Sequence, residues 1–240
     1  MELPVNQIIC GDCLEVMGDW EAGTVPIICT DPPYNIGKKY DGYSDDMPDE
    51  AYWVLMEQWV HQWYRVMGDG YLYCSHSDKG IYRLKPIIER AGFTYIQTLI
   101  WSGRNGYSMQ LHRRSWSYRH EPIIFAMKGN PPELSAGEAG DWYTSVIEAP
   151  RPQSNFREGR CHPTQKPVLL YYRLLKRTPG ELVVDPFVRS GTTCVAAEVL
   201  GKKWIGIENS EQYAAKARER IEAGRTGVPM REIGQMALPY

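Results

Sequence analysis

The residues best suited to chemistry form a short rigid segment, 30–34, which reads T-D-P-P-Y and follows an apolar stretch. Its two prolines, Pro32 and Pro33, fix their own φ angles and restrict the residue before each of them. The carboxylate of Asp31 beside a rigid carbonyl can accept both hydrogens of an exocyclic amino group, while the ring of Tyr34 stacks on the attached base. The segment therefore predicts a site for a purine or pyrimidine amine, with a proline-stiffened turn as the plain alternative.

A second segment, 182–193, joins an apolar run to a turn of small residues and then to a helical pattern. Backbone N–H groups at such a helix N-terminus bind anions. Roughly twenty residues beyond this loop, another apolar run ends in Glu208, where an acid accepts hydrogen bonds from ribose hydroxyls. These features predict a nucleoside-bearing cofactor. Nicotinamide or flavin is the competing interpretation, which the lack of a G-x-G-x-x-G turn disfavours.

The elements that must position these segments alternate between short apolar runs and helical periodicities, which predicts a doubly wound, Rossmann-like α/β sheet. The expected strands span 7–10, 26–30, 71–75, 94–101, 122–127, 181–185 and 204–208. The expected helices span 49–67, 78–92, 191–200 and 210–223, and another begins at Pro167. Pro86 implies a kink or a late start in the helix that contains it. Loop composition marks 35–48, 102–119 and 129–161.

The composition is that of a globular protein. The 240 residues fit a single domain, and 43% hydrophobic residues allow a full core. No apolar run approaches the roughly 18 residues of a membrane span, and the start of the chain lacks a secretory pattern, so a cytoplasmic protein is expected. The six cysteines are scattered, and Cys10 and Cys13 have no second pair at zinc spacing, so no metal site is expected.

Charge is unevenly distributed along the chain. The net charge of −2 argues against a protein that coats nucleic acid by bulk attraction. Two segments, 83–120 and 151–177, each carry seven Lys or Arg against one acid, a local charge of +6. They predict one face for a polyanion, and an ordinary solvated surface explains them equally well.

Three motifs together carry a resemblance to a known family. They are the D-P-P-Y segment 31–34, the H-P-T-Q-K-P segment 162–167 and the loop 185–193, in that order. With them the chain resembles the DNA amino-methyltransferases that use S-adenosylmethionine. The motif order is similar to that of the beta group of N6-adenine methyltransferases from bacteria and phages. The match runs from about residue 9 to residue 217, nearly the whole chain.

For the target base, the resemblance implies a catalytic segment made of Asp31, Pro32, Pro33 and Tyr34. Asp31 and the carbonyl of Pro32 would accept hydrogens from the target amine, and Tyr34 would stack on a base flipped out of double-stranded DNA. The chemistry needs neither a nucleophilic side chain nor a metal, because the enzyme only has to align the amine with the methyl–sulfur bond. We expect Asp31 to act mainly as acceptor and positioner.

For the cofactor, the resemblance implies Glu208 at the ribose, Asp12 near the adenine and Lys166 near the carboxylate. A capping aspartate and a surface lysine are the plain alternatives for Asp12 and Lys166. The loop residues assigned to the cofactor are Asp185, Pro186, Phe187, Ser190, Gly191 and Thr192.

One position departs from the family pattern, which usually reads D-P-F-x-G-S-G. Arg189 stands where the first of those glycines is expected. Glycine there lets the backbone approach the cofactor or take a positive φ. The arginine predicts either a tolerated change with weaker cofactor binding or a catalytically impaired relative that still binds DNA.

Target recognition falls to an inserted, loop-rich region, 102–161. Arg and Asn side chains read guanine and adenine edges in the major groove, and other cations hold phosphates. The candidate DNA-binding residues are Arg104, Asn105, His112, Arg113, Arg114 and Arg119. Because the region is short, a short recognition site or a homodimer that adds contacts is expected.

The sequence therefore predicts a site-specific methyltransferase that modifies N6 of adenine in DNA, of the kind found in restriction-modification systems. The first alternative is the same fold acting on N4 of cytosine. In the family resemblance, D-P-P-Y favours adenine and S-P-P-Y favours cytosine.

Overall fold

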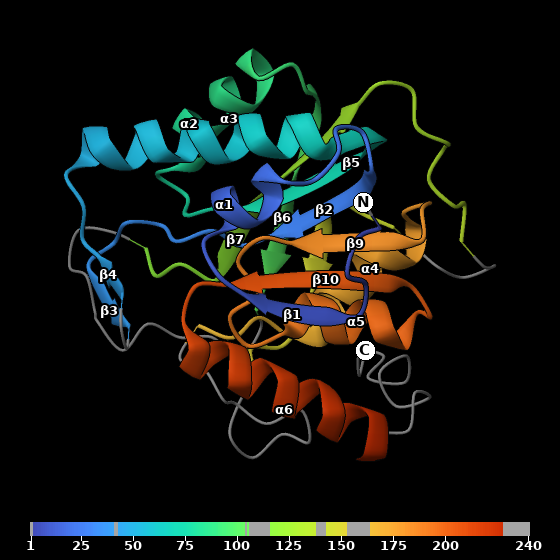
Figure 1. The fold of residues 1–240 in the computed structure, drawn as a ribbon. Helices are drawn as coiled ribbons and strands as arrows, with labels where there is room; N and C mark the ends of the chain where they lie inside the picture. Colours follow the sequence, from blue (N-terminus) through green and yellow to red (C-terminus); the bar gives the residue numbers. More distant parts are fainter. Residues whose placement is uncertain are drawn as a thin grey trace.

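The computed structural model describes residues 2–40, 43–103, 105, 116–137, 143–152 and 164–227. Within them, eight strands form one sheet in the order β1-β10-β9-β2-β5-β7-β6-β8 (Figure 1). The bounds are β1 Gln7–Cys10, β10 Lys203–Glu208, β9 Leu182–Asp185, β2 Val25–Thr30, β5 Met67–Ser75, β7 His120–Lys128, β6 Thr94–Ser102 and β8 Val146–Glu148.

Strand direction decides which residues meet at one edge of the sheet. Strands β1, β10, β9, β2 and β5 are parallel, whereas β7 runs antiparallel to both β5 and β6. The start of β7 therefore lies at the edge where β2, β5, β9 and β10 end. In open α/β sheets this carboxyl edge is where ligands bind.

Helices cover both faces of the sheet (Figure 1). One layer contains α1 (Cys13–Gly18), α2 (Asp49–Val66) and α3 (Ile81–Arg90), and the other contains α4 (Val168–Arg177), α5 (Thr192–Val199) and α6 (Glu211–Gly227). The α2 residues Trp53, Met56, Val60 and Trp63 recur at helical spacing and are buried, as the sequence pattern predicts. The doubly wound α/β fold is confirmed.

Four short elements are absent from the helices and strands that the sequence predicts. Helix α1 has six residues, and the hairpin of β3 (Lys38–Tyr40) and β4 (Tyr43–Asp45) lies within 35–48. Strand β8 has three residues, paired in parallel with β6. Elements this short carry too few residues for a periodic pattern. Helix α3 begins at Ile81 rather than 78, which is the late start that Pro86 implies.

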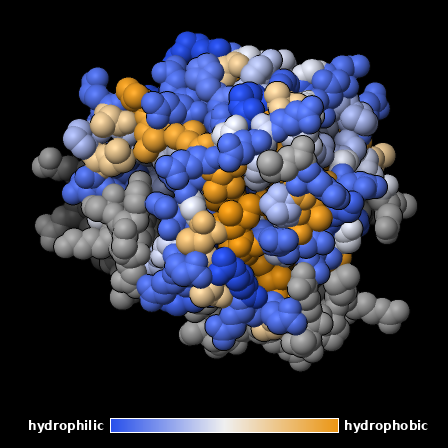
Figure 2. All heavy atoms as spheres, viewed as in Figure 1, coloured by the Kyte–Doolittle hydropathy of each residue, from blue (hydrophilic) through white to orange (hydrophobic). Residues whose placement is uncertain are grey.

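The surface in the view of Figure 1 is mostly polar, with a band of apolar side chains over the edge of the sheet where β1 lies (Figure 2). Among the described helices, none has the length and apolar character needed to cross a bilayer.

Candidate functional site

Asp31 directly follows β2 at the carboxyl edge and is only 5% exposed. Its Oδ1 accepts a hydrogen bond from the Tyr34 hydroxyl and lies 3.4 Å from Nζ of Lys166. Its Oδ2 lies 3.2 Å from Nη1 of Arg189. Burial raises the pKa of Asp31, but the charges of Lys166 and Arg189 outweigh burial and hold it below its ordinary value. Asp31 is therefore a buried, ionised acceptor.

Glu121 supplies a second carboxylate from the start of β7. It forms an ion pair with Lys166, its Oε2 lies 3.3 Å from the Tyr34 hydroxyl, and its Oε1 lies 3.2 Å from Nη1 of Arg151. Nζ of Lys166 also donates to the Tyr34 hydroxyl at 3.1 Å. Two carboxylates thus share one lysine. The sequence reasoning missed Glu121, and the only signal was an acid at the first residues of a strand that had to pair antiparallel.

The cluster of charged and hydroxyl groups consists of Asp31, Tyr34, Glu121, Lys166 and Arg189. Beside it lie the rings of Tyr52, Trp53 and His76. The ring of His76, just after β5, stacks on Tyr34 with centroids 4.9 Å apart and on Trp53 with centroids 5.4 Å apart. Nδ1 of His76 accepts from the backbone N–H of Ser77 at 2.8 Å, so Nε2 carries the proton and bonds the Tyr52 hydroxyl at 2.7 Å. Burial lowers the pKa of His76 to about 4, which keeps the ring neutral.

A cavity of about 800 Å³ opens above the cluster, within the roughly 300–1,000 Å³ range of ligand clefts. Its walls combine the rings already described with charged groups at the carboxyl edge. Among the lining residues are Asp31, Tyr34, Tyr52, Trp53, His76, Arg83, Trp101, Tyr118, Glu121, Lys166 and Arg189. Flat rings beside buried acceptors suit a planar base with an amino group.

The second loop is organised around Asp185 at the end of β9. Its Oδ1 accepts from the Thr30 hydroxyl at 2.9 Å and from the backbone N–H of Phe187 at 3.1 Å. Burial raises the pKa of Asp185 to about 6, although hydrogen bonds from Thr193, Phe187 and Thr30 lower it. Asp185 thereby ties the loop to β2. The Phe187 ring packs edge-on against Trp59 of α2, with centroids 4.7 Å apart.

Glu208, at the end of β10, holds the far side of the same loop. Its Oε2 accepts from the backbone N–H of Arg189 at 2.9 Å, and its Oε1 accepts from the backbone N–H of Ser210 at 3.1 Å. Arg189 has φ 46° and Gly191 has φ 76°, so both residues are in the left-handed region. Arginine is therefore found in a conformation that favours glycine.

The other residues assigned to the cofactor are placed as follows. Asp12 caps α1, because its Oδ1 accepts from the backbone N–H of Leu14 at 2.8 Å, and Gly11 next to it donates its N–H to the Glu208 carbonyl at 2.9 Å. Ser190 and Thr192 are buried beside the N-terminus of α5. Arg220 of α6, which the sequence reasoning missed, donates to the Thr192 hydroxyl at 2.8 Å.

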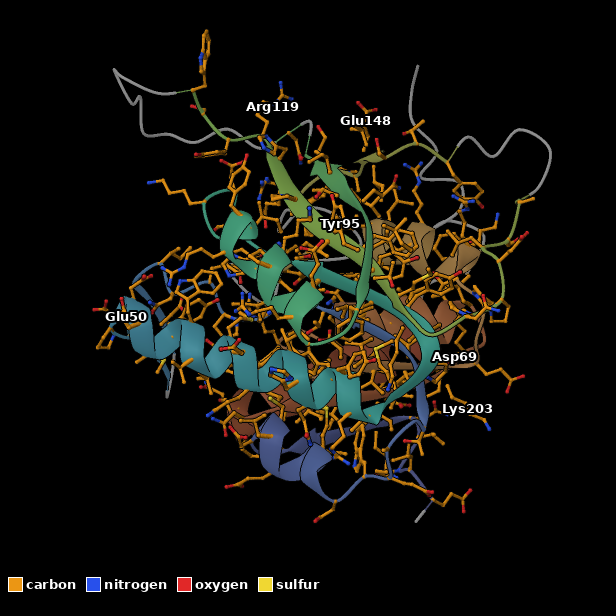
Figure 3. All side chains as sticks on the ribbon, turned by 90° about the horizontal axis from the view of Figure 1, so that it is seen from above. Glu50, Asp69, Tyr95, Arg119, Glu148 and Lys203 are labelled. Atoms are coloured by element: carbon orange, nitrogen blue, oxygen red, sulfur yellow. The ribbon has the colours of Figure 1, made fainter. Side chains whose placement is uncertain are left out.

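The residues assigned to DNA are only partly covered by the structure. Arg104, His112, Arg113 and Arg114 lie outside the described residues. Asn105 holds the backbone of Arg151 through its side chain, accepting at 2.7 Å and donating at 3.0 Å. Arg119 is exposed just before β7 (Figure 3).

A model of the N6/N4 family, described as DNA methylase, matches residues 25–219. The chain belongs to this DNA methylase family. It is 30% identical over 227 residues to the putative methylase YubD of Escherichia coli strain K12, covering 91% of each chain. It is 27% identical over 242 residues to the type II methyltransferase M.HpaI of Haemophilus parainfluenzae, covering 92% of this chain and 76% of that one.

Solved structures of other methylases share the fold. M1.HpyAVI in its SAM complex aligns with a TM-score of 0.70 at 23% identity, over 90% of this chain and 98% of that chain. The cytosine-N4-specific PvuII DNA methyltransferase aligns with a TM-score of 0.77 at 17% identity, over 95% of this chain and 90% of that chain. Methylases of this family take the methyl group from S-adenosylmethionine.

Proposed function

We propose that this DNA methylase transfers a methyl group from S-adenosylmethionine to N6 of adenine in double-stranded DNA, with Asp31 as the acceptor that holds the amine. The observation that carries the proposal is the place of Asp31. It is buried and ionised between an aromatic-lined cavity of about 800 Å³ and the loop that Glu208 anchors.

The residues around Glu208 fit a nucleoside donor. Two backbone N–H groups orient the Glu208 carboxylate at the carboxyl edge, where it would accept from ribose hydroxyls. Asp12 lies at the end of the neighbouring strand β1 and would contact the adenine of the donor. Gly191 and Thr192 at the N-terminus of α5 would face its methionine end, together with Asp185, Pro186, Phe187 and Ser190.

On the target side, the chain's own residues hold and orient the amine. The Asp31 carboxylate and the Pro32 carbonyl would accept its two hydrogens, while the base stacks on the face of Tyr34 that points away from His76. Burial and the nearby Asp31 charge raise the pKa of Tyr34 well above its usual value, so its hydroxyl stays a donor to Asp31. Lys166, assigned from the sequence to the cofactor carboxylate, instead forms ion pairs with Asp31 and Glu121, so here it would position the acceptor.

The bound donor supplies a methyl group on a positively charged sulfur: the carbon–sulfur bond breaks with its electron pair on sulfur while the carbon–nitrogen bond forms. The nitrogen then carries an extra proton, which passes to Asp31 and from there to water. Because the amine sits inside a paired base, the base must first leave the duplex and enter the large cavity. Arg104, His112, Arg113, Arg114 and Arg119 would hold DNA in the bacterial cytoplasm, with a homodimer adding contacts.

The experiment is transfer of labelled methyl to unmethylated genomic DNA, followed by digestion to nucleosides and mass spectrometry. Label in N6-methyladenine that disappears in Asp31→Ala and persists in the exposed control Asp46→Ala supports the proposal. Label that survives in Asp31→Ala contradicts the role of the acceptor.

A second candidate is N4 of cytosine, which presents a similar amine. The fold likeness to the cytosine-N4-specific PvuII enzyme, with a TM-score of 0.77, favours it. The aspartate at the head of the motif favours adenine instead. Label found in N4-methylcytosine would support the same site but make cytosine the target base. No methyl transfer by the natural protein, together with methyl transfer by Arg189→Gly, would identify a catalytically impaired relative.

A further inference from the structure

Arg189 joins the two halves of the proposed site. Its backbone N–H donates to Glu208, while its guanidinium lies 3.2 Å from Oδ2 of Asp31 and 3.3 Å from the Thr164 hydroxyl. Its side chain is only 16% exposed. The left-handed backbone at φ 46° therefore directs a long cation inward, onto the carboxylate that the proposed reaction uses.

The guanidinium stands at the boundary between two cavities. Arg189 lines the cavity of about 800 Å³, and it also lines a small cavity of about 20 Å³ beside Asp185, Ser190 and Thr192. The smaller cavity has room for about one water molecule and for nothing larger. A donor whose methionine end enters this loop must therefore displace a side chain. Within the loop 185–193 the described residue that lines both cavities is Arg189, and Thr164 and Lys166 line both from outside the loop.

We propose that Arg189 sets the charge selectivity of the donor site. Its guanidinium occupies the position beside Asp31 that the positively charged sulfur of the methyl donor would take. It therefore weakens binding of the sulfonium donor more than binding of the neutral thioether product. This inference rests on the proposed function. Reacting atoms come within about 3.5 Å of one another, so the sulfonium must approach the carboxylate that now pairs with Arg189. S-Adenosylhomocysteine has the same shape without that charge or the methyl group.

The size of the effect follows from Coulomb's law. Two unit charges roughly 6 Å apart at a partly solvated site repel each other enough to change a dissociation constant about tenfold. A purely structural arginine would act otherwise. Its loss would loosen the loop and raise the dissociation constants of donor and product by the same factor, because both ligands contact the loop in the same way.

The experiment is isothermal titration calorimetry with S-adenosylmethionine and with S-adenosylhomocysteine, at low ionic strength and without DNA. Arg189→Gln removes the charge but still places a side chain at a left-handed backbone position, and Arg189→Lys keeps the charge. Arg189→Gly removes the charge and adopts the left-handed conformation without strain. Lys203→Gln is the matched control. It removes one positive charge from an exposed position at the start of β10, opposite the edge that holds Glu208 (Figure 3).

The measured quantity is the ratio of the two dissociation constants, donor over product. We expect this ratio to fall about tenfold in Arg189→Gln and in Arg189→Gly, and to stay near the natural value in Arg189→Lys and Lys203→Gln. An unchanged ratio in both uncharged variants overturns the inference and leaves the proposed function intact. Failure of every folded variant, and of the natural protein, to bind either ligand overturns both.

Discussion

Replacement of Asp31 by asparagine should destabilise the protein, which is the opposite of the gain often found when a catalytic group is removed. Asp31 is 5% exposed, and its two cationic partners, Lys166 and Arg189, have side chains 7% and 16% exposed. Removal of one partner from a buried ion pair costs about 3–5 kcal/mol. In the variant, Lys166 keeps its ion pair with Glu121 and Arg189 keeps its hydrogen bond to the Thr164 hydroxyl. We therefore expect the free energy of unfolding to fall by a smaller amount, about 2–3 kcal/mol.

The pH dependence follows from the lowered pKa of Asp31. The native value lies below the ordinary 3.8, so the unfolded chain takes up the proton first as the pH falls. The stability that the charged carboxylate provides is then complete above about pH 5 and is lost as the pH falls through the native pKa. The difference between the natural protein and Asp31→Asn should therefore stay constant from pH 8 to about pH 5 and narrow below it.

Urea unfolding followed by tryptophan fluorescence at pH 8, 6.5, 5 and 4 measures this difference, with the exposed Asp46→Asn as control. Thermal unfolding should show the variant about 4–12 °C lower than the natural protein. An Asp31→Asn variant as stable as the natural protein, or more stable, would mean that the desolvation penalty of the buried carboxylate exceeds its attraction to the two cations. The acceptor would then be a strained group rather than a stabilised one.

Three further outcomes are expected. Glu121→Gln leaves Lys166 to Asp31 alone, which weakens Asp31 as an acceptor and should lower the single-turnover methylation rate about tenfold, with partial recovery in Glu121→Asp; a normal rate in Glu121→Gln would exclude this role. His76 has a native pKa of about 4 against 6.5 unfolded, so the natural protein should lose about 1.4 kcal/mol per pH unit below pH 6.5 relative to His76→Gln, and parallel unfolding free energies from pH 7 to 5 would refute the buried neutral ring. Gly191→Ala places a side chain at φ 76° and should cost about 1–2 kcal/mol in thermal unfolding, whereas Gly18→Ala, which meets no atom within 4 Å, should cost little; equal losses would refute the strain argument.

Sheet and helices could be predicted because their signals are local. Each buried parallel strand is an apolar run, and α2 repeats large apolar residues at helical spacing across 18 residues. Helix α1 has a recognisable cap in Asp12, but its six residues bury only Cys13 and Met17, which is too short a run to show helical spacing. Strand β8 has three residues and pairs with β6, a tertiary contact that a three-residue stretch does not reveal.

The site could be predicted in part for the same reason. The rigid segment 31–34 consists of consecutive residues, so the sequence alone marks Asp31 and Tyr34 as candidates. The charges that decide how Asp31 behaves come from 121, 166 and 189, which the fold brings together from β7 and from two loops. The antiparallel direction of β7 puts Glu121 at the carboxyl edge, and strand direction is a tertiary property that no local pattern encodes.

The most direct test of the account is a crystal structure with S-adenosylhomocysteine bound. We predict that the ribose hydroxyls contact the Glu208 carboxylate and that the sulfur lies within about 6 Å of the Asp31 carboxylate, as transfer to an amine held there requires. A ligand whose sulfur points away from Asp31, with the ribose remote from Glu208, would contradict the assignment of this cluster as the site of methyl transfer.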